Sequence, residues 1–589
     1  MADPKPTARA HGRSLADFPK LSAAEQKLIA CARNGEWCEL DPKRPEKPTE
    51  ANTIRAGLIR FLALGGDDDN PVHERGVQLR GAWVPDGLNL DAVIATRRLA
   101  IVQSHFKTAI RVQDAQLSAL SLDGSRIPGL NADRCHISGS TRLCSDFKSI
   151  GAVRLLGAQI GGTLVCSGGS FENAGDVALA ADGIMVGGRV FLDQGFNASG
   201  TVRLHSAQIG GALICSGGRF AGANGIALNA EGARVEGSVF LSNSFYASGE
   251  VSLTGAKIGG TLECGGGRFE NVEGYALHAE SAVVKGTLYF RGVNPIKGLV
   301  NFASAHFASI ADDITSWPVN ALMLDGFRYD HIGSGPTDAS TRIAWLKKQH
   351  PRFLNEDFAP QPWEQLIKVL REMGHGRDAD EVAIAKQHAL RAAGKIGTRK
   401  PKTDFPDRWW MPIKVRRWID ARWNDLSNFV ARCFHDLYGK LAGYGYRPTR
   451  IILWVIGLLA ISAFAFSTAA ENGLMAPTNP VLHAHEAGAN VNVTACGANG
   501  DVQPPQYWVR CAGMPAEYTT FSPLGYAADM ILPLVNLQQD SEWGPVVSNA
   551  KGPLYWGVVT RLLGWFDILS GWIVSLMFVA IVSRLVEKD

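Results

Sequence analysis

The sequence predicts a mainly β fold: a parallel β-helix, a solenoid with 23–26 residues per coil, followed by a helical hairpin and two transmembrane helices. A motif of glycine and apolar residues recurs in the middle of the 589-residue chain with a period of 49. Glycine is abundant, with 64 copies, and has no Gly-X-Y period. Two long apolar segments lie near the end of the chain. The net charge of only +3 argues against a protein that binds nucleic acid along its whole length.

Residues 1–75 are expected to form an N-terminal tail and a short helical cap. The stretch from Met1 to Lys20 is polar, contains proline and lacks the apolar core of a secretory signal. We therefore expect the N-terminal region to stay on the side of the membrane where it is made. Ten cysteines are too few for a disulfide-stabilised scaffold.

Residues 76–333 are predicted to form the β-helix. Strong copies of the motif, Ile-Gly-Gly followed by an apolar residue and a cysteine, alternate with weaker copies, and the six begin at Ile160, Val186, Ile209, Val235, Ile258 and Val284. Within each copy apolar residues alternate with small or variable ones, which is the periodicity of a β-strand. One coil therefore contains a strand, a tight turn and a further strand, and the segment accommodates roughly ten coils.

Two columns of the repeat predict buried structure. One position is glycine in all six copies, which indicates either a positive φ or a close approach of two backbones: Gly162, Gly188, Gly211, Gly237, Gly260 and Gly286. Cys166, Cys215 and Cys264 recur two coils apart, so about 9–10 Å separates neighbouring thiols. That spacing is too long for a disulfide or a shared metal, and we interpret these cysteines as small buried apolar residues.

A third column is predicted to face outward. It contains an aromatic residue on every second coil, at Phe191, Phe240 and Tyr289. An exposed apolar stripe of this kind is normally covered, either by a loop of the same chain, by a protein partner or by another subunit. The three aromatic residues are therefore a candidate partner surface.

Residues 334–398 are predicted to form a helical hairpin, because apolar residues recur there with a period of 3.6. Gly374, Gly376 and Ala379 match the pattern G-x-G-x-x-A, but the charged helical stretch before them differs from the strand that a dinucleotide-binding fingerprint requires. His483 and His485 have no accompanying metal-binding motif. We predict no catalytic, cofactor-binding or metal-binding residue, and enzymatic activity stays open.

Residues 449–468 and 561–583 are the two predicted spans. Residues 395–450 contain 13 Lys/Arg against 5 Asp/Glu, whereas residues 468–555 contain 2 against 7. The positive-inside rule then places the N-terminal part in the cytoplasm, the loop 469–560 outside, and the tail 584–589 in the cytoplasm. The predicted location is a bacterial inner membrane.

The basic segment 399–448 precedes the first span and is rich in tryptophan. Its stretch from Arg408 to Trp418 is typical of a helix on a membrane surface, and Arg408, Lys414, Arg416 and Arg417 are predicted to contact lipid headgroups. Nucleic-acid binding is the alternative, and we predict that none occurs because basic residues beside a span usually meet anionic lipid.

The outer loop and the second span contain three further candidates. Cys496 and Cys511 would lie in an oxidising compartment of a bacterial cell and are predicted to form a structural disulfide. Asp567 is an acid in or at the edge of the second span, where it is either functional or interfacial and solvated. The stretch from Tyr518 to Tyr526 is similar to the pore loop of two-span ion channels but lacks the T-V-G-Y-G filter.

The Gly-Ala-x-Ile-Gly-Gly-x-Leu-x-Cys repeats, the helix from Leu366 to Lys386 and the Gly-Tyr-Gly-Tyr-Arg-Pro segment before the first span resemble a group of largely uncharacterised bacterial membrane-anchored β-solenoid proteins. Some members carry the label membrane-associated oxidoreductase. The solenoid is also distantly similar, at the level of fold, to the bactofilin scaffolds. The resemblance covers roughly residues 75–585 and supplies no catalytic residue.

Three functions follow as hypotheses. The first is a membrane-anchored cytoplasmic solenoid that acts as a non-enzymatic scaffold or sensor, contacting the lipid bilayer and either a protein partner or further copies of itself. The second is an oligomeric, channel-like membrane effector regulated by the solenoid. The third is an oxidoreductase, which only the family label implies.

Overall fold

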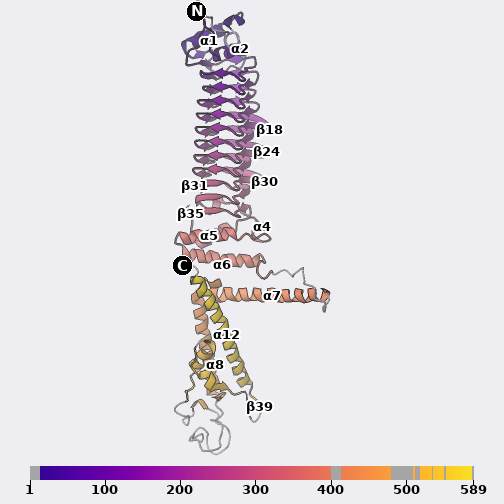
Figure 1. The fold of residues 1–589 in the computed structure, drawn as a ribbon, viewed down its shortest axis with the longest axis vertical. Coiled ribbons are helices and arrows are strands. Elements are labelled where there is room, and N and C mark those ends of the chain that lie inside the picture. Colours follow the sequence, from indigo (N-terminus) through magenta and orange to yellow (C-terminus); the bar gives the residue numbers. More distant parts are fainter. Residues whose placement is uncertain are drawn as a thin grey trace, which may run out of the picture. The chain divides into compact units, whose positions relative to one another are not determined.

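The computed structural model describes residues 14–398, 413–478, 508–510, 518–533, 535–549 and 552–586. They belong to two compact units, Met1–Ala393 and Gly394–Asp589. The first unit contains a parallel β-solenoid of about 11 turns, and helices follow it (Figure 1). Two helices of the second unit are long and apolar enough to cross a membrane. The predicted fold class is therefore confirmed.

An upstream coil of the solenoid contains four short strands rather than the two that the sequence predicted, and in the coils from residue 159 onward the last two are replaced by one longer strand. In one coil these are β8 (Gln116–Leu117), β9 (Leu120–Ser121), β10 (Arg126–Ile127) and β11 (Leu130–Asn131). Each pairs in parallel with the equivalent strand of the next coil, for example β8 with β12 and β9 with β13. The strands stack into two sheets of 21 and 14 strands.

The 21-stranded sheet contains the two columns that the repeat revealed. The first column consists of β4 (Ile94–Ala95), β8, β12 (His136–Ile137), β16 (Gln159–Ile160), β19 (Met185–Val186), β22 (Gln208–Ile209), β25 (Arg234–Val235) and β28 (Lys257–Ile258). The second consists of β1 (Cys38–Glu39), β2 (Val77–Arg80), β5 (Leu99–Val102), β9, β13 (Thr141–Arg142), β17 (Leu164–Val165), β20 (Val190–Phe191), β23 (Leu213–Ile214), β26 (Val239–Phe240) and β29 (Leu262–Glu263). Longer strands join both columns at the end: β31 (Val283–Phe290), β33 (His306–Asp312) and β35 (Arg328–Ser334).

The 14-stranded sheet completes each coil. Its short strands are β3 (Trp83–Val84), β6 (His105–Phe106), β7 (Ile110–Arg111), β10, β11, β14 (Lys148–Ser149), β15 (Val153–Arg154) and β34 (Leu322–Met323). Its longer strands are β18 (Ser170–Ala180), β21 (Asn197–Arg203), β24 (Arg219–Asn229), β27 (Tyr246–Ser252), β30 (Arg268–His278) and β32 (Lys297–Asn301). The 11-residue strands β18, β24 and β30 carry register shifts against their neighbours, which accounts for the alternation of 26- and 23-residue coils.

Stacked apolar side chains fill the solenoid. A ladder of phenylalanines has ring centroids 5.1–5.4 Å apart: Phe147, Phe171, Phe196, Phe220, Phe245 and Phe269. Cys166, Cys215 and Cys264 are buried and free. Burial raises the pKa of each of these three thiols. They therefore pack as small apolar residues, as expected from their spacing.

The six-glycine column forms a hydrogen-bonded corner. All six glycines lie among the described residues, and none has a positive φ, so that alternative is wrong. Instead the backbones approach closely: the N–H of Gly237 donates to the carbonyl of Gly211 at 2.9 Å, and that of Gly260 donates to Gly237 at 2.9 Å. A Cβ built on Gly237 would lie 2.8 Å from the carbonyl oxygen of Gly211. The corner excludes side chains because successive coils touch there.

Helices close both ends of the solenoid. The N-terminal elements are η1 (Leu15–Asp17), α1 (Ala23–Asn34) and α2 (Ala56–Ala63); the C-terminal elements are η2 (Ile314–Ser316), α3 (Ala339–Leu346), α4 (Pro351–Leu354), α5 (Gln361–Glu372) and α6 (Gly376–Ala392). Helices α5 and α6 form the predicted hairpin. A buried ion pair fixes α3 to the last coils: Arg342 donates to both carboxylate oxygens of Asp312 at 2.8 and 2.9 Å, and the Trp317 indole donates at 2.7 Å.

The second unit is built on long helices. Its elements are α7 (Ile413–Ala442), η3 (Gly443–Gly445), α8 (Pro448–Glu471), β36 (Met475–Pro477), η5 (Trp508–Arg510), α10 (Pro523–Ile531), α11 (Gln539–Glu542), β37 (Trp543–Pro545), β38 (Ser548–Asn549), β39 (Gly552–Pro553) and α12 (Tyr555–Val586). Helix α8 covers the first predicted span. Helix α12 begins at Tyr555, six residues before the second predicted span.

Candidate functional site

The two long helices α8 and α12 pack on each other and expose most of their apolar surface. Only 17% of the most apolar stretch of α8 is buried, and 22% of that of α12. Leu453 and Phe464 on α8 and Leu576 on α12 are among the exposed large side chains. A core helix of a water-soluble domain would bury such residues, whereas a helix in a bilayer exposes them to lipid.

Helix α10 packs against both long helices. Its contact with α12 is close, because a Cβ on Gly571 would lie 2.1 Å from the carbonyl oxygen of Ile531, at the end of α10. Gly571 lies near the midpoint of α12, so α10 reaches about half-way along that helix. If α8 and α12 cross a membrane, α10 would be a re-entrant segment, which is tolerated there when it is packed against protein.

The stretch from Tyr518 to Tyr526, whose sequence is similar to a pore loop without its filter, contains the start of α10. Ser522 caps α10 by accepting a hydrogen bond from the N–H of Gly525 at 3.1 Å, and Pro523 occupies the first turn. After α10 the chain folds back beside this helix. The Asp529 carboxylate on α10 accepts hydrogen bonds from the backbone N–H of Leu537 at 2.8 Å and from that of Asp540 at 3.0 Å. Residues 518–526 therefore form a capped helix start rather than a row of filter carbonyls.

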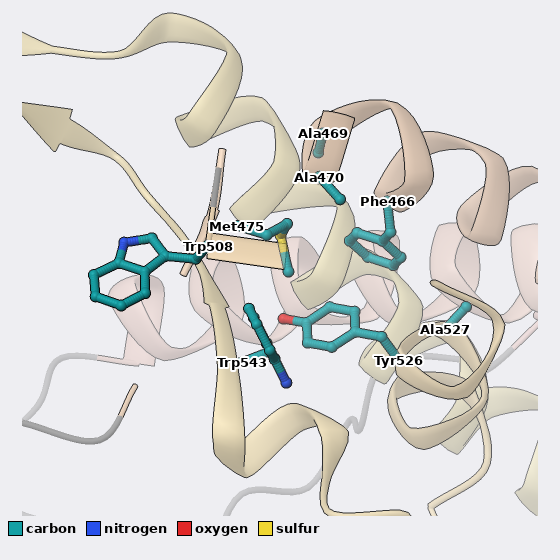
Figure 2. Close-up of a cluster of buried hydrophobic side chains, with 8 residues drawn as sticks. All are labelled: Phe466, Ala469, Ala470, Met475, Trp508, Tyr526, Ala527 and Trp543. Carbon is teal, nitrogen blue, oxygen red and sulfur yellow. The ribbon is translucent and has the colours of Figure 1, made fainter. Parts of the chain in front are cut away.

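A buried aromatic cluster holds the end of α8, α10 and the β36–β37 pair together (Figure 2). Its members are Phe466, Ala469, Ala470, Met475, Trp508, Tyr526, Ala527 and Trp543. Figure 2 shows the ring of Tyr526 reaching from α10 toward Met475 and Trp543. The Trp543 indole donates to the carbonyl of Thr519 at 3.0 Å, which ties β37 to the segment that precedes α10. The sequence analysis did not identify this cluster.

Asp567 lies in the contact between the two long helices. It is 12 residues from the start of α12 and 19 from its end, and its exposed fraction is 0%. The hydroxyl of Ser462 on α8 donates to its Oδ1 at 2.9 Å, and its Oδ2 has no hydrogen-bond partner among the described residues. The side chain is therefore buried between α8 and α12, and its position within a membrane stays a prediction.

Helix α7 has a continuous exposed apolar face. Its residues recur at helical spacing: Val415, Trp418, Ile419, Trp423, Leu426, Phe429, Val430, Phe434 and Leu437. Three of the predicted headgroup contacts belong to α7: Lys414, Arg416 and Arg417. The structure describes their backbone but not their side chains, and Arg408 lies outside the described residues. The amphipathic helix extends to Ala442, 24 residues beyond the stretch that suggested it.

The aromatic column of the solenoid is in register. Phe191 pairs with Ile214, Ile214 with Phe240, and Tyr289 with Glu263 in adjacent coils. Phe191 and Phe240 are half-buried, and Tyr289 is exposed at 40%. The column faces outward on the 21-stranded sheet, while the long strands of the 26-residue coils belong to the other sheet. Its use as a partner surface stays a prediction.

The remaining candidates contribute no described site. Cys496, Cys511, His483 and His485 lie outside the described residues, so the predicted disulfide stays a prediction. Within the described ranges no group of three or more His, Cys, Asp or Glu could hold a metal ion. Gly374 and Gly376 lie at the turn between α5 and α6, with helix on both sides.

No family model matches the chain, and neither the curated proteins nor the solved structures contain a significant match to it.

Proposed function

We propose that the protein is a membrane-anchored β-solenoid that acts as a non-enzymatic scaffold or sensor in a bacterial inner membrane. The observation that carries the proposal is the exposed apolar surface of α8 and α12, which is continuous enough to make the pair insoluble unless lipid covers it. The solenoid offers a rigid, repetitive surface, and its core is filled by side chains. The basic segment before α8 and the acidic segment after it favour a cytoplasmic solenoid and cytoplasmic termini.

Helix α7 is proposed to lie in the headgroup region of the cytoplasmic leaflet. Its apolar face is unpartnered among the described residues, Trp423 is exposed at 68%, and basic residues including Lys414, Arg416 and Arg417 lie in its first turns. Figure 1 shows α7 running across the direction of α8 and α12, as an in-plane helix must. A fluorophore on the exposed Cys433 tests this in nanodiscs: lipids brominated near the headgroup should quench it strongly, and Cys433→Ser defines background labelling.

The partner of the aromatic column is proposed to be a second copy of the chain. Successive side chains of the column are one strand spacing apart, about 4.8 Å. The same column on a second copy has the same spacing, so the side chains of the two columns can interdigitate along their length. The double variant Phe240→Ser, Tyr289→Ser should lower the mass of the full-length protein in nanodiscs from oligomer to monomer. The control Gln208→Ser changes an outward residue of the neighbouring column. A monomeric wild type would contradict the proposed self-association.

Topology is tested separately. A reporter that functions only in the cytoplasm should be active when it is fused after Asp589. A reporter that functions only outside the cytoplasm should be active when it is inserted in the 469–560 loop. The opposite pattern would place the solenoid outside the cytoplasm and would refute the proposed cytoplasmic location of the scaffold.

An oligomeric channel-like effector is the second candidate, and the re-entrant helix α10 favours it. Two spans and one re-entrant helix cannot enclose a pore alone, so the channel needs a symmetric assembly of several copies. Recordings of the purified protein in planar bilayers should show a conductance that Gly571→Leu abolishes, because a side chain there displaces α10. A silent wild type that is monomeric by mass would remove this candidate.

A further inference from the structure

The carboxyl group of Asp567 is buried between two apolar helices, where an ionised group is strongly destabilised. With 12 residues of α12 before it and 19 after it, and a rise of 1.5 Å per residue, it is about 18 Å from the start of the helix and about 28 Å from its end. Helix α8 contributes Ser462 as its hydrogen-bond donor, and α10 fills the space beside α12 at Met530 and Ile531. Among the described residues no cationic side chain forms an ion pair with it.

An ionised carboxylate cannot be satisfied by this arrangement. One neutral hydroxyl serves Oδ1, Oδ2 has no donor among the described groups, and the side chain has no contact with solvent. Burial of a bare carboxylate costs several kcal/mol. A protonated acid is different: its O–H donates to the oxygen of Ser462, and the second oxygen is then a neutral carbonyl, which costs far less to bury.

A metal cation is a poorer occupant than a proton. Ser462 Oγ and Asp567 Oδ2 supply two oxygen ligands, whereas hard cations take about six. A proton requires no cavity and no further ligands. We propose that Asp567 is a proton-binding site in the contact between α8 and α12, filled from the outer side along α10.

The route is indicated by the titratable groups that surround Tyr526. This residue of α10 lies within electrostatic range of Asp529 on α10, Asp540 on α11, and Arg561 and Asp567 on α12. Asp540 is exposed and Asp529 is buried. Burial and the neighbouring Asp529 carboxylate raise the pKa of Asp540, so Asp540 retains a proton more readily than an isolated acid. The proposed route runs from the exposed Asp540 past Asp529 and the Tyr526 phenol to Asp567.

The proposal rests on α8 and α12 crossing the membrane but does not depend on the scaffold function. Infrared spectroscopy of the full-length protein in nanodiscs tests it through the carbonyl-stretching band of a protonated carboxylic acid. The wild type should show this band at neutral pH, Asp567→Asn should remove it, and Asp540→Asn should leave it in place. A spectrum without the band, or one that Asp567→Asn leaves unchanged, would overturn the proposal.

Two further measurements separate the occupant and the route. The thermal midpoint of the wild type should be the same in sodium, potassium and N-methylglucamine chloride; a rise with sodium or potassium that Asp567→Asn abolishes would show a cation site instead. After transfer to heavy water, Tyr526→Phe should slow the deuterium shift of the Asp567 band several-fold. An unchanged rate would refute the route along α10. Asp567→Asn mimics the neutral acid in shape, so it is expected to fold with an unchanged midpoint.

Discussion

Replacing Gly237 by alanine adds one methyl group to the solenoid and is expected to destabilise it. The new Cβ would lie 2.8 Å from the carbonyl oxygen of Gly211, 2.9 Å from its carbonyl carbon and 3.0 Å from the nitrogen of Ala212. All three are backbone atoms, so no side-chain rotation relieves the contact. The same carbonyl oxygen accepts the hydrogen bond from the N–H of residue 237 at 2.9 Å.

The magnitude follows from this geometry. Forcing extra carbon into a packed contact costs about 1–3 kcal/mol. Alanine recovers about 0.4–1 kcal/mol by restricting the unfolded chain, because φ at this position is not in the left-handed region. A net loss of roughly 1–2 kcal/mol is expected.

Thermal unfolding of the full-length protein in detergent, followed by the β-sheet circular dichroism signal, measures the loss. Gly376→Ala is the matched control, because Gly376 has no positive φ and nothing within 4 Å of its added Cβ. Gly183→Ala adds a second control, with φ of +64° and open space, and isolates the cost of backbone strain. If Gly237→Ala melts at the midpoint of Gly376→Ala, the corner contact is not what excludes side chains, and the steric explanation fails.

Three further predictions concern other parts of the chain. Arg342→Met strands the buried Asp312 carboxylate and should cost about 3–5 kcal/mol in urea unfolding, most of which Asp312→Leu in the same chain restores. Hydrogen bonds from Lys297 and a neighbouring arginine lower the pKa of Glu270 from 4.5 to about 2, so the stability they provide is present above pH 4.5 and lost as the pH falls toward 2. Glu270→Gln should therefore weaken the dependence of the thermal midpoint on pH in that window. A variant with the pH profile of the wild type would contradict this prediction. In the folded protein, maleimide should modify Cys433 before the three core cysteines, which should stay unmodified until denaturant is added, as mass spectrometry of the peptides will show.

The solenoid could be predicted because its signal is repeated. Six copies of one motif average out local noise, and the columns at Ile160 and Leu164 are indeed the inward positions of β16 and β17. The two other strands of each coil were missed because their columns differ between the 23- and 26-residue coils. A shorter period was present upstream, where buried residues recur every five positions: Val112, Leu117, Leu122, Ile127, Ala132 and Ile137. That pattern is typical of a coil with four corners.

The second unit was predictable only in part. Hydropathy and charge identify α8 and α12, but α10 is nine residues long and its role depends on packing against both of them, which no local pattern encodes. The sequence named Asp567 as an acid in or at the edge of the span but left its burial open for a related reason. Its depth depends on where α12 begins, and the residues from Tyr555 to Gly557 resemble an interfacial stretch in composition although they belong to the helix.

The glycine corner makes the length of the solenoid adjustable in fixed steps. Each coil bonds only to the coils next to it, and residues 160–186, 209–235 and 258–284 repeat the same contacts. Removing residues 209–257 would join Gln208 to Ile258, at equivalent positions, and shorten the rod by two strand spacings, about 10 Å, without leaving an unmatched surface. Duplication of 49 residues would lengthen it equally. The distance between the capped ends of the solenoid can therefore change in steps of two coils during evolution, while the sequences of both ends stay the same.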